Sequence, residues 1–400
     1  MAEVTTPPAR IDVLVYNQIS ATGLARLPTE RYRVGKDIAE PRAILLRSAD
    51  LHKTPIADSV VAIGRAGAGT NNIPVAAMTE RGVPVFNAPG ANANAVKELV
   101  IAGMLMAARN LAPALEFVAR LERGAADLER QIEDGKKRFA GFELAGQTLG
   151  VIGLGKIGCL VAEAGLKLGM QVLGHDPEIT VDAAWGLHSQ VRRATSVNEV
   201  LRSARFVTLH VPLLDSTRHL VNDGNIGLMP EGAVLLNFSR EGVVSDAAVT
   251  EALAGGRLAG YVCDFPSAAT IGQPKVIALP HLGASTGEAE ENCAVMVADQ
   301  LRDYLEHGQV VNAVNFPEVR MERGSRYRVA IANSNVPNML GQISTTMAQA
   351  GLNIHNMLNK SRGAMAYTLV DVERAVDADV LRSLAAIEGV LRVRYLPYTA

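Results

Sequence analysis

The sequence predicts an α/β protein with two doubly wound parallel sheets, followed by a small domain with a different order of strands. Short apolar runs alternate with helical patterns through most of the chain. Three glycines, Gly153, Gly155 and Gly158, join one of these runs to an amphipathic helix. From about Arg326 onward the strands alternate polar with apolar residues, as half-buried strands do. The change in pattern predicts a separate C-terminal domain.

Length, charge and cysteine content limit the class of protein. With 400 residues the chain is too long for one core, and two or three domains are expected. A net charge of −2 provides no basic surface for nucleic acid, so no such partner is expected. The three cysteines have neither disulfide nor metal spacing, which favours a reducing compartment and no metal. The N-terminus lacks a signal peptide pattern and no apolar run reaches membrane length, so we expect a cytoplasmic protein without a membrane segment.

Polar residues follow the strands predicted in the first part of the chain. The strands are expected at residues 11–15, 43–46, 60–63 and 83–86. Ligands of parallel sheets bind beyond the carboxyl ends of the strands, and three of these ends carry Arg47, Arg65 and Asn87. Either arginine alone is equally well explained as an exposed strand-end residue, but both at one edge indicate an anion site. The predicted substrate-binding residues are Arg47, Ser48, Arg65, Ala66, Gly67 and Asn87.

A strand, a glycine turn, a helix and a second strand follow one another between Thr148 and Asp176. The first glycine permits a tight turn, the second lets a pyrophosphate approach the backbone, and the third lets helix and strand pack closely. The start of the helix presents free N–H groups to the phosphates. Asp176 ends the second strand, where a carboxylate holds both ribose hydroxyls and repels a 2′-phosphate. The cofactor predicted from these residues is NAD rather than NADP.

Further strands are predicted at residues 206–210, 233–236, 258–263 and 276–279, and their ends carry Arg240 and His281. Residues 96–110 form an apolar helix that is either buried or an interface. Residues 111–146 are more polar, and their charged stretch at residues 129–138 is interpreted as a solvated surface segment without a catalytic role. A helix at residues 288–306 returns the chain to the first domain. The predicted domains are residues 1–97 with 288–318 for the substrate, 98–287 for NAD, and 326–400.

The C-terminal residues predict a βαββαβ order, which is that of a ferredoxin-like domain. Its strands are expected at residues 327–332, 352–354, 365–372 and 390–395, and its helices at residues 339–350 and 379–387.

Taken together, these motifs resemble the D-isomer-specific 2-hydroxyacid dehydrogenases over almost the whole chain. The matching stretches are residues 64–73, 86–89, 153–158, 209–212, 237–242, 280–286 and 312–317. The C-terminal segment resembles an ACT domain. The resemblance implies a homodimer or homotetramer with Arg240 and His281 as catalytic residues. It implies NAD-binding residues at Gly153, Gly155, Lys156, Ile157, Gly158, Asp176, Val211, Pro212, Thr217, Phe238, Ser239, Asp264, Gly283 and Ala284.

The chemistry of this family fits those two residues. Oxidation of a 2-hydroxy acid needs a base for the hydroxyl proton and a cation for the carboxylate and the developing carbonyl. His281 suits the base because the pKa of histidine lies near working pH. Arg240 suits the cation because a guanidinium binds a carboxylate through two hydrogen bonds.

Two positions depart from the family pattern. The family places a glutamate shortly after the strand that ends at Asp264 to pair with the histidine, and residues 265–270 contain none. Lys275 and Glu288 lie nearby in the sequence, but neither is assigned that role. The usual Asn-x-Pro-Gly turn of the ACT segment ends in Asn338 instead of glycine. Asparagine tolerates a left-handed backbone, so we expect the turn to form.

The resemblance implies oxidation of 3-phospho-D-glycerate, with L-serine as a feedback effector at Asn333 and Asn335. Reduction of a smaller 2-keto acid such as hydroxypyruvate or glyoxylate is the enzymatic alternative. A non-catalytic NAD-sensing regulator is the other alternative, supported only by the missing glutamate. For the C-terminal domain, a purely dimerising role stays open.

Overall fold

The computed structural model describes residues 3–6, 8 and 10–398, and the chain divides into two compact units. Unit 1 comprises Met1–Ala91 and Gly287–Ala400, and unit 2 comprises Asn92–Thr286. The sequence analysis placed the corresponding boundaries after residues 97 and 287.

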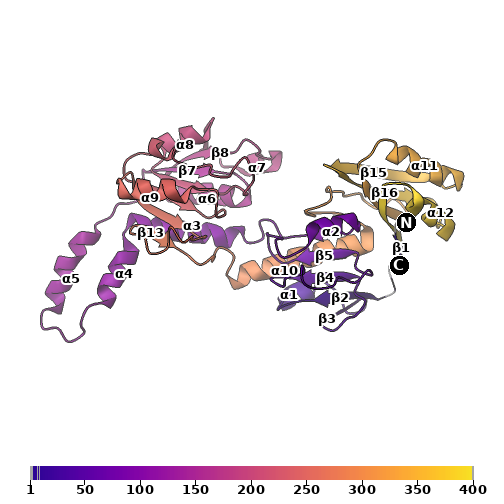
Figure 1. The fold of residues 1–400 in the computed structure, drawn as a ribbon, viewed down its shortest axis with the longest axis horizontal. Coiled ribbons are helices and arrows are strands. Elements are labelled where there is room, and N and C mark those ends of the chain that lie inside the picture. Colours follow the sequence, from indigo (N-terminus) through magenta and orange to yellow (C-terminus); the bar gives the residue numbers. More distant parts are fainter. Residues whose placement is uncertain (1–2, 7, 9, 399–400) are drawn as a thin grey trace. The chain divides into compact units, whose positions relative to one another are not determined.

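Unit 2 contains a parallel sheet with the strand order β13-β12-β11-β10-β7-β8-β9. Its strands are β7 (Thr148–Ile152), β8 (Gln171–His175), β9 (Arg192–Arg193), β10 (Phe206–Leu209), β11 (Ala233–Asn237), β12 (Leu258–Cys263) and β13 (Val276–Ala278). The order reverses between β7 and β10, which is the position where doubly wound sheets bind their ligands. The predicted Rossmann-like fold is therefore confirmed, and the glycine turn follows β7 (Figure 1).

Helices cover both faces of this sheet. The helices α3 (Ala93–Ala108) and α6 (Lys156–Lys167) share one apolar core with it. The helices α8 (Val197–Ser203) and α9 (Asp246–Ala254) share another. A short helix, α7 (Val181–Gly186), follows β8. The strand ends that bear the predicted cofactor residues are thereby held by packing on both faces.

A helical pair, α4 (Leu111–Ala119) and α5 (Leu128–Lys136), extends from the rest of unit 2 (Figure 1). The sequence analysis interpreted this stretch only as a solvated segment. Neither helix buries an apolar side chain, although α4 carries several, and its Leu111, Leu115 and Val118 are exposed. Among the described residues no single helix is long and apolar enough to cross a membrane. The helices α3 and α4 reach that length and composition only as a pair bent by 70°.

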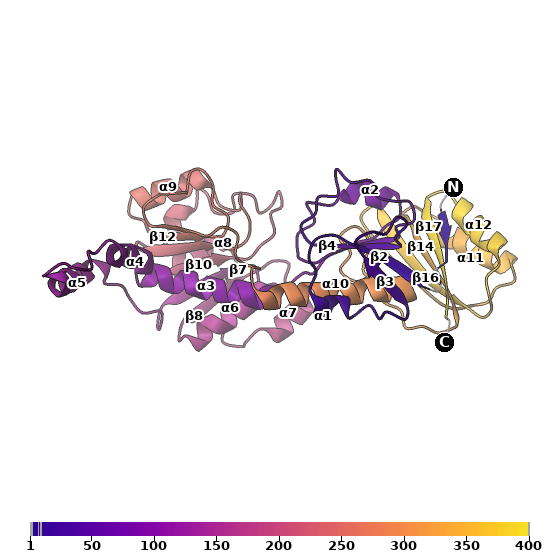
Figure 2. The same ribbon diagram turned by 90° about the horizontal axis from the view of Figure 1, so that it is seen from below.

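Unit 1 contains a parallel sheet with the order β3-β2-β4-β5-β6. Its strands are β2 (Ile11–Val15), β3 (Tyr32–Gly35), β4 (Ala43–Leu46), β5 (Ala62–Arg65) and β6 (Val85–Phe86), with the short helices α1 (Ala21–Leu24) and α2 (Val75–Glu80) between them. The edge strand β3 and both short helices are absent from the predicted elements. The long helix α10 (Gly287–His307) packs on the sheet, where a Cβ atom at Gly64 would lie 2.4 Å from Val297 (Figure 2).

The C-terminal part of unit 1 has the predicted βαββαβ order. It consists of β14 (Tyr327–Ser334), α11 (Met339–Gln349), β15 (Ile354–Arg362), β16 (Met365–Val372), α12 (Ala378–Ala386) and β17 (Val390–Pro397). The strands lie in the order β17-β14-β16-β15, and neighbouring strands are antiparallel, as in a ferredoxin-like sheet. An additional strand, β1 (Glu3–Thr5), pairs in parallel with β17. Residues 3–5 therefore belong to this sheet and not to the substrate domain, where the prediction placed them.

The C-terminal sheet covers the end of α10 with a set of hydrogen bonds to consecutive carbonyl groups. Arg394 donates to the carbonyls of Tyr304 and Leu305, Arg323 to that of Glu306, Arg328 to that of His307, and the Tyr367 hydroxyl to that of Gly308. The last carbonyls of a helix lack helical partners and carry partial negative charge, which guanidinium groups satisfy well. The C-terminal sheet and the parallel sheet also contribute to one apolar core. The C-terminal domain is thus joined to α10 by packing, not by a linker alone.

Candidate active site

The glycine turn after β7 has a different requirement at each of its glycines. Gly153 has φ +92°, and a Cβ atom there would lie 2.5 Å from the carbonyl oxygen of His210. A Cβ atom at Gly158 would lie 1.9 Å from the carbonyl oxygen of Gly153. At Gly155, by contrast, nothing lies within 4 Å of that position. Gly153 and Gly158 are therefore required by close packing. Gly155 leaves open the N-terminus of α6, which is where the phosphates of a dinucleotide bind in such folds.

Asp176 is fixed beside this turn. Its Oδ2 accepts a hydrogen bond from the backbone N–H of Leu154 at 2.8 Å, and its Oδ1 accepts one from that of Glu178 at 2.9 Å. The side chain remains partly exposed. The structure therefore places the predicted ribose-binding carboxylate directly next to the phosphate turn.

The ends of β10 and β11 are connected by hydrogen bonds of the predicted cofactor residues. The N–H of Val211 donates to Ser239 Oγ at 3.1 Å, and the hydroxyl of Thr217 donates to the carbonyl of Pro212 at 2.6 Å. Phe238 and Ser239 are buried. Val211, Pro212, Thr217, Phe238 and Ser239 thus form one connected wall at the carboxyl edge of the sheet.

His210 is a half-buried histidine that the sequence analysis used only as the end of a strand and within a matching stretch. Its Nε2 lies 2.9 Å from Thr208 Oγ1, and among the described residues its buried Nδ1 has no hydrogen-bond partner. Burial lowers the pKa of His210 to about 3, so the imidazole is neutral at neutral pH. A neutral, enclosed side chain at this place supports the wall but does not exchange protons with a substrate.

Arg240 and His281, the two predicted catalytic residues, lie against one aromatic ring. The guanidinium carbon of Arg240 is 5.4 Å from the centroid of the Phe265 ring. The centroid of the His281 imidazole is 4.5 Å from the same ring. Both predicted residues are exposed, which leaves them accessible to a substrate. Phe265 was not predicted, because a phenylalanine in a loop carries no motif of its own.

Asp264 holds the loop that carries His281. Its Oδ1 accepts from the N–H of Leu282 at 2.7 Å and its Oδ2 from the N–H of Gly283 at 2.8 Å. Burial raises the pKa of Asp264, while the two N–H donors and His281 lower it. A Cβ atom at Gly283 would lie 2.9 Å from Oδ2, so glycine permits this approach. Asp264, Gly283 and the adjacent Ala284 therefore shape the loop, and their contact with a cofactor stays a prediction.

The predicted anion-binding residues are brought together at the carboxyl edge of the unit 1 sheet. Arg65 Nε donates to the carbonyl of Arg47 at 3.0 Å. Its guanidinium lies over Gly67, whose φ of +152° is a backbone conformation that residues other than glycine rarely adopt. The amide of Asn87 donates to the carbonyl of Ala68 in the same turn. Ala66 is buried beneath it, and its N–H donates to the carbonyl of Leu46.

Arg47 has a partner that the sequence analysis missed. Its Nη2 forms an ion pair with Glu290 Oε1 at 2.6 Å, from the first turn of α10. The neighbouring Ser48 is exposed, and its N–H donates to Asn17 Oδ1 instead of pointing to a free site. The acidic residues at the start of α10 were visible in the sequence, but only the packing of α10 on the sheet brings Glu290 to Arg47.

Comparison with known proteins assigns the family. Residues 101–283 match the model described as D-isomer specific 2-hydroxyacid dehydrogenase, NAD binding domain. The chain is similar to the D-3-phosphoglycerate dehydrogenase of Escherichia coli (strain K12), with 35% identity over 355 residues that cover 85% of this chain and 82% of the relative. The chain belongs to the D-isomer-specific 2-hydroxyacid dehydrogenases. It is accordingly an oxidoreductase, and its cofactor is NAD.

Other relatives extend this comparison. The D-3-phosphoglycerate dehydrogenase of Methanocaldococcus jannaschii is 37% identical over 303 residues, which are 74% of this chain and 55% of that relative. The fold is shared with D-2-hydroxyisocaproate dehydrogenase, at a TM-score of 0.62 and 21% identity over 76% of this chain and all of the other. It is also shared with an NAD⁺-bound 3-phosphoglycerate dehydrogenase of Entamoeba histolytica, at a TM-score of 0.59 and 23% identity over 77% and 99% of the two chains.

The residues of this dehydrogenase fit the dinucleotide. The open position at Gly155 leaves room for the pyrophosphate at the start of α6, which begins with Lys156 and Ile157. Asp176 would meet the adenine ribose beside the same turn.

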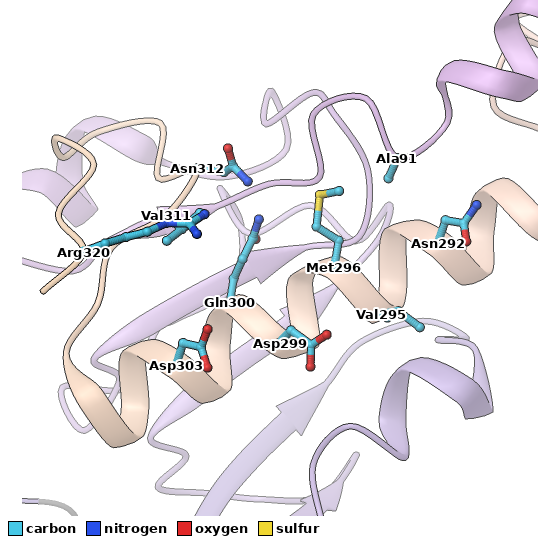
Figure 3. A pocket seen from close by; sticks show the side chains of 10 residues that line it. All are labelled: Ala91, Asn292, Val295, Met296, Asp299, Gln300, Asp303, Val311, Asn312 and Arg320. Carbon is cyan, nitrogen blue, oxygen red and sulfur yellow. The ribbon is translucent and has the colours of Figure 1, made fainter. Parts of the chain in front are cut away.

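Unit 1 contains a cavity of about 570 Å³, and none of the predicted site residues lines it. Its wall is formed by α10 and by the segment that leads to the C-terminal sheet (Figure 3). Gln300 points from α10 toward Asn312, and among the described residues its buried amide has no hydrogen-bond partner.

A smaller cavity of about 180 Å³ lies in the C-terminal domain, and both predicted effector residues line it. Asn333 is buried and its amide donates to the carbonyl of Ser334, while the exposed Asn335 donates to the carbonyl of Gly363. Asn338, with φ +64°, immediately precedes α11. The expected left-handed turn therefore forms without glycine, and it shapes one side of this cavity.

Proposed function

We infer that this protein oxidises 3-phospho-D-glycerate to 3-phosphohydroxypyruvate with NAD, the first step of L-serine biosynthesis, as a cytoplasmic homodimer or homotetramer. The observation that carries the choice of substrate is the pair of guanidiniums, Arg47 and Arg65, at one edge of the unit 1 sheet. A 2-hydroxy acid needs one cation for its carboxylate, and two further cations suit a phosphate. The curated relatives named D-3-phosphoglycerate dehydrogenase support the same substrate.

In this mechanism the residues of unit 2 act on the substrate's carboxylate and hydroxyl. Arg240 binds the carboxylate through its guanidinium and stabilises the developing carbonyl oxygen. His281 removes the hydroxyl proton at an imidazole nitrogen. When bound, NAD supplies the nicotinamide ring that accepts the hydride from C2. Phe238 and Ser239, which precede Arg240, are buried, and the Arg240 guanidinium donates a hydrogen bond to the carbonyl of Ser239.

A smaller 2-keto acid, such as hydroxypyruvate or glyoxylate, is the second candidate substrate. One observation favours it: Glu290 neutralises part of the positive charge of Arg47. A carboxylate beside the anion site opposes a phosphate by like-charge repulsion. Variants of these two residues distinguish the substrates.

We expect Arg47→Gln to raise the KM for 3-phospho-D-glycerate by roughly 10- to 100-fold, since a hydrogen bond to a charged group contributes about 1.5–3 kcal/mol. The KM for D-glycerate, which lacks the phosphate, changes much less. In the matched variant Glu290→Gln, the KM for the phosphorylated substrate falls. Steady-state rates with both substrates check this, and equal losses for both in Arg47→Gln would mean that Arg47 does not bind the phosphate.

We expect the protein to use NAD at least 100-fold more efficiently than NADP, and Asp176→Asn to narrow that ratio about 10-fold or more. The carboxylate attracts the ribose hydroxyls and repels a 2′-phosphate, whereas the amide keeps its size and only loses the charge. The ratio of kcat/KM for the two cofactors measures the effect. A wild-type protein that used both equally well would contradict the role of Asp176.

L-Serine is the proposed feedback effector, bound in the 180 Å³ cavity of the ACT-like domain through Asn333 and Asn335. Inhibition requires different affinities for two conformations of the enzyme. We expect L-serine to lower kcat/KM in the full-length protein and Asn335→Ala to weaken its binding about 10-fold. Calorimetry that detects no serine binding, with or without NAD, would leave the domain with an assembly role only.

A further inference from the structure

The orientation of His281 is unexplained by the family pattern. The glutamate that pairs with this histidine in the family is absent from residues 265–270. Among the described residues, no carboxylate forms a hydrogen bond or an ion pair with the imidazole of His281. An unrestrained imidazole rotates about its side-chain bonds, and a general base needs a defined orientation toward the proton that it removes.

The aromatic ring of Phe265 is the side chain in contact with that imidazole. The ring centroids are 4.5 Å apart and the ring planes are inclined by 47°. This spacing is that of a favourable aromatic pair. Phe265 lies in the segment in which the family carries its glutamate, directly after the buried Asp264.

The backbone on both sides of this contact is fixed by Asp264. Its carboxylate holds the N–H groups of Leu282 and Gly283, the two residues that follow His281. His281 itself has φ +56°, a conformation that costs free energy for a residue other than glycine and is kept because its surroundings determine it. Asp264 thus places the Cα atom of His281, and the imidazole meets a ring that is anchored in the neighbouring position of the chain.

Arg240 reaches the same ring with its guanidinium carbon at 5.4 Å from the centroid. Its Nη1 also donates to the carbonyl of Ser239 at 2.6 Å. A cation near the face of an aromatic ring is attracted to it. One ring therefore restrains both side chains that the mechanism uses.

We propose that Phe265 is a positioning residue, which sets the plane of the His281 imidazole and so replaces the orienting function of the family's glutamate. The ring occupies neither imidazole nitrogen, so both remain available for the proton of the substrate. The ring supplies no negative charge, so Phe265 replaces only the orienting effect of the glutamate and not its electrostatic effect. The proposal rests on His281 being the base, and it does not depend on which 2-hydroxy acid is oxidised.

The test combines kinetics with a spectroscopic signature of the ring contact. Phe265→Leu keeps an apolar side chain of similar size but removes the ring, and Phe265→Tyr keeps the ring. Phe142→Leu is the matched control, because Phe142 lies elsewhere in unit 2, against Phe206 and Arg205. We expect kcat to fall about 2- to 12-fold in Phe265→Leu with the KM for NAD unchanged, which is the range that loss of an aromatic pair gives. Phe265→Tyr recovers most of kcat, and Phe142→Leu leaves it unaltered.

The imidazole Cε1–H resonance of His281, assigned by its loss in His281→Asn, reports the contact without turnover. The adjacent ring shifts this resonance in the wild type and in Phe265→Tyr, and the shift disappears in Phe265→Leu. A kcat in Phe265→Leu within twofold of wild type, an equal loss in Phe265→Tyr, or an unchanged resonance in Phe265→Leu would each overturn the proposal. If 3-phospho-D-glycerate is not a substrate, reduction of hydroxypyruvate supplies the kinetic comparison. The two proposals, the oxidation of 3-phospho-D-glycerate and the positioning role of Phe265, can therefore fail independently of each other.

Discussion

Replacement of His281 by asparagine is expected to lower kcat by about 100- to 10,000-fold, the contribution of a positioned general base. Binding of NAD is expected to survive. Asp264 holds the loop through the N–H groups of Leu282 and Gly283, which the substitution keeps. Steady-state kinetics measure the first effect and calorimetric titration with NAD measures the second.

Asparagine is chosen because the backbone at position 281 has a positive φ. His281 has φ +56°, which asparagine adopts more readily than alanine does. His281→Ala is therefore the comparison variant, and any extra loss in it reports backbone strain instead of proton transfer. Near-normal turnover in His281→Asn would remove His281 from the mechanism.

Replacement of Arg328 by alanine is expected to lower the free energy of unfolding of unit 1 by about 3–5 kcal/mol. Arg328 and Asp371 form an ion pair in which both side chains are fully buried, so the substitution leaves a carboxylate without its partner. It also uncovers the carbonyls of His307 and Glu322, to which Arg328 donates. Urea denaturation followed by circular dichroism provides the measurement.

The double variant Arg328→Met with Asp371→Leu is the matched control for this prediction. It removes both charges and keeps much of the buried volume, so its loss is expected to be clearly smaller than that of Arg328→Ala. A single variant that lost less than about 1 kcal/mol would show that the pair and the capped end of α10 do not hold the C-terminal sheet in place.

The sequence predicted the structure well where the residues that serve one chemical purpose lie close together along the chain. The strand before Gly153, the helix after Gly158 and the carboxylate of Asp176 all lie within one local unit, and the structure places them as predicted. The same holds for the strand ends of unit 1 that bear Arg47 and Arg65. Parallel strands bring their carboxyl ends to one edge, so the order of strands alone groups these side chains.

Elements without an apolar pattern were not predictable. The strand β15 (Ile354–Arg362) was expected to end at residue 354, since most of its residues are polar; it lies at the edge of its sheet and has no buried residue. The helix α5 is also mostly polar, and it buries no apolar side chain. In each case the strand pairing or the helical hydrogen bonds form although apolar residues are not buried at regular intervals. Prediction of secondary structure from sequence depends on that regular spacing.

Contacts between distant parts of the chain were also beyond the sequence. The strand β1 joins β17 through residues almost 400 positions apart, and Arg392 of β17 pairs with Glu3. Glu290 reaches Arg47 only because α10 packs on the sheet that bears Arg47. Phe265 meets His281 because Asp264 closes the loop between them. Each of these depends on tertiary packing, which no local pattern encodes.

The most direct test of the proposed function is the initial rate of NADH formation by the purified full-length protein. The substrates are 3-phospho-D-glycerate and D-glycerate, each supplied with NAD and compared at equal concentration. The account predicts a kcat/KM for 3-phospho-D-glycerate at least 100-fold above that for D-glycerate, because only the former engages Arg47 and Arg65. Equal rates with the two substrates, or no NADH from 3-phospho-D-glycerate, would contradict it.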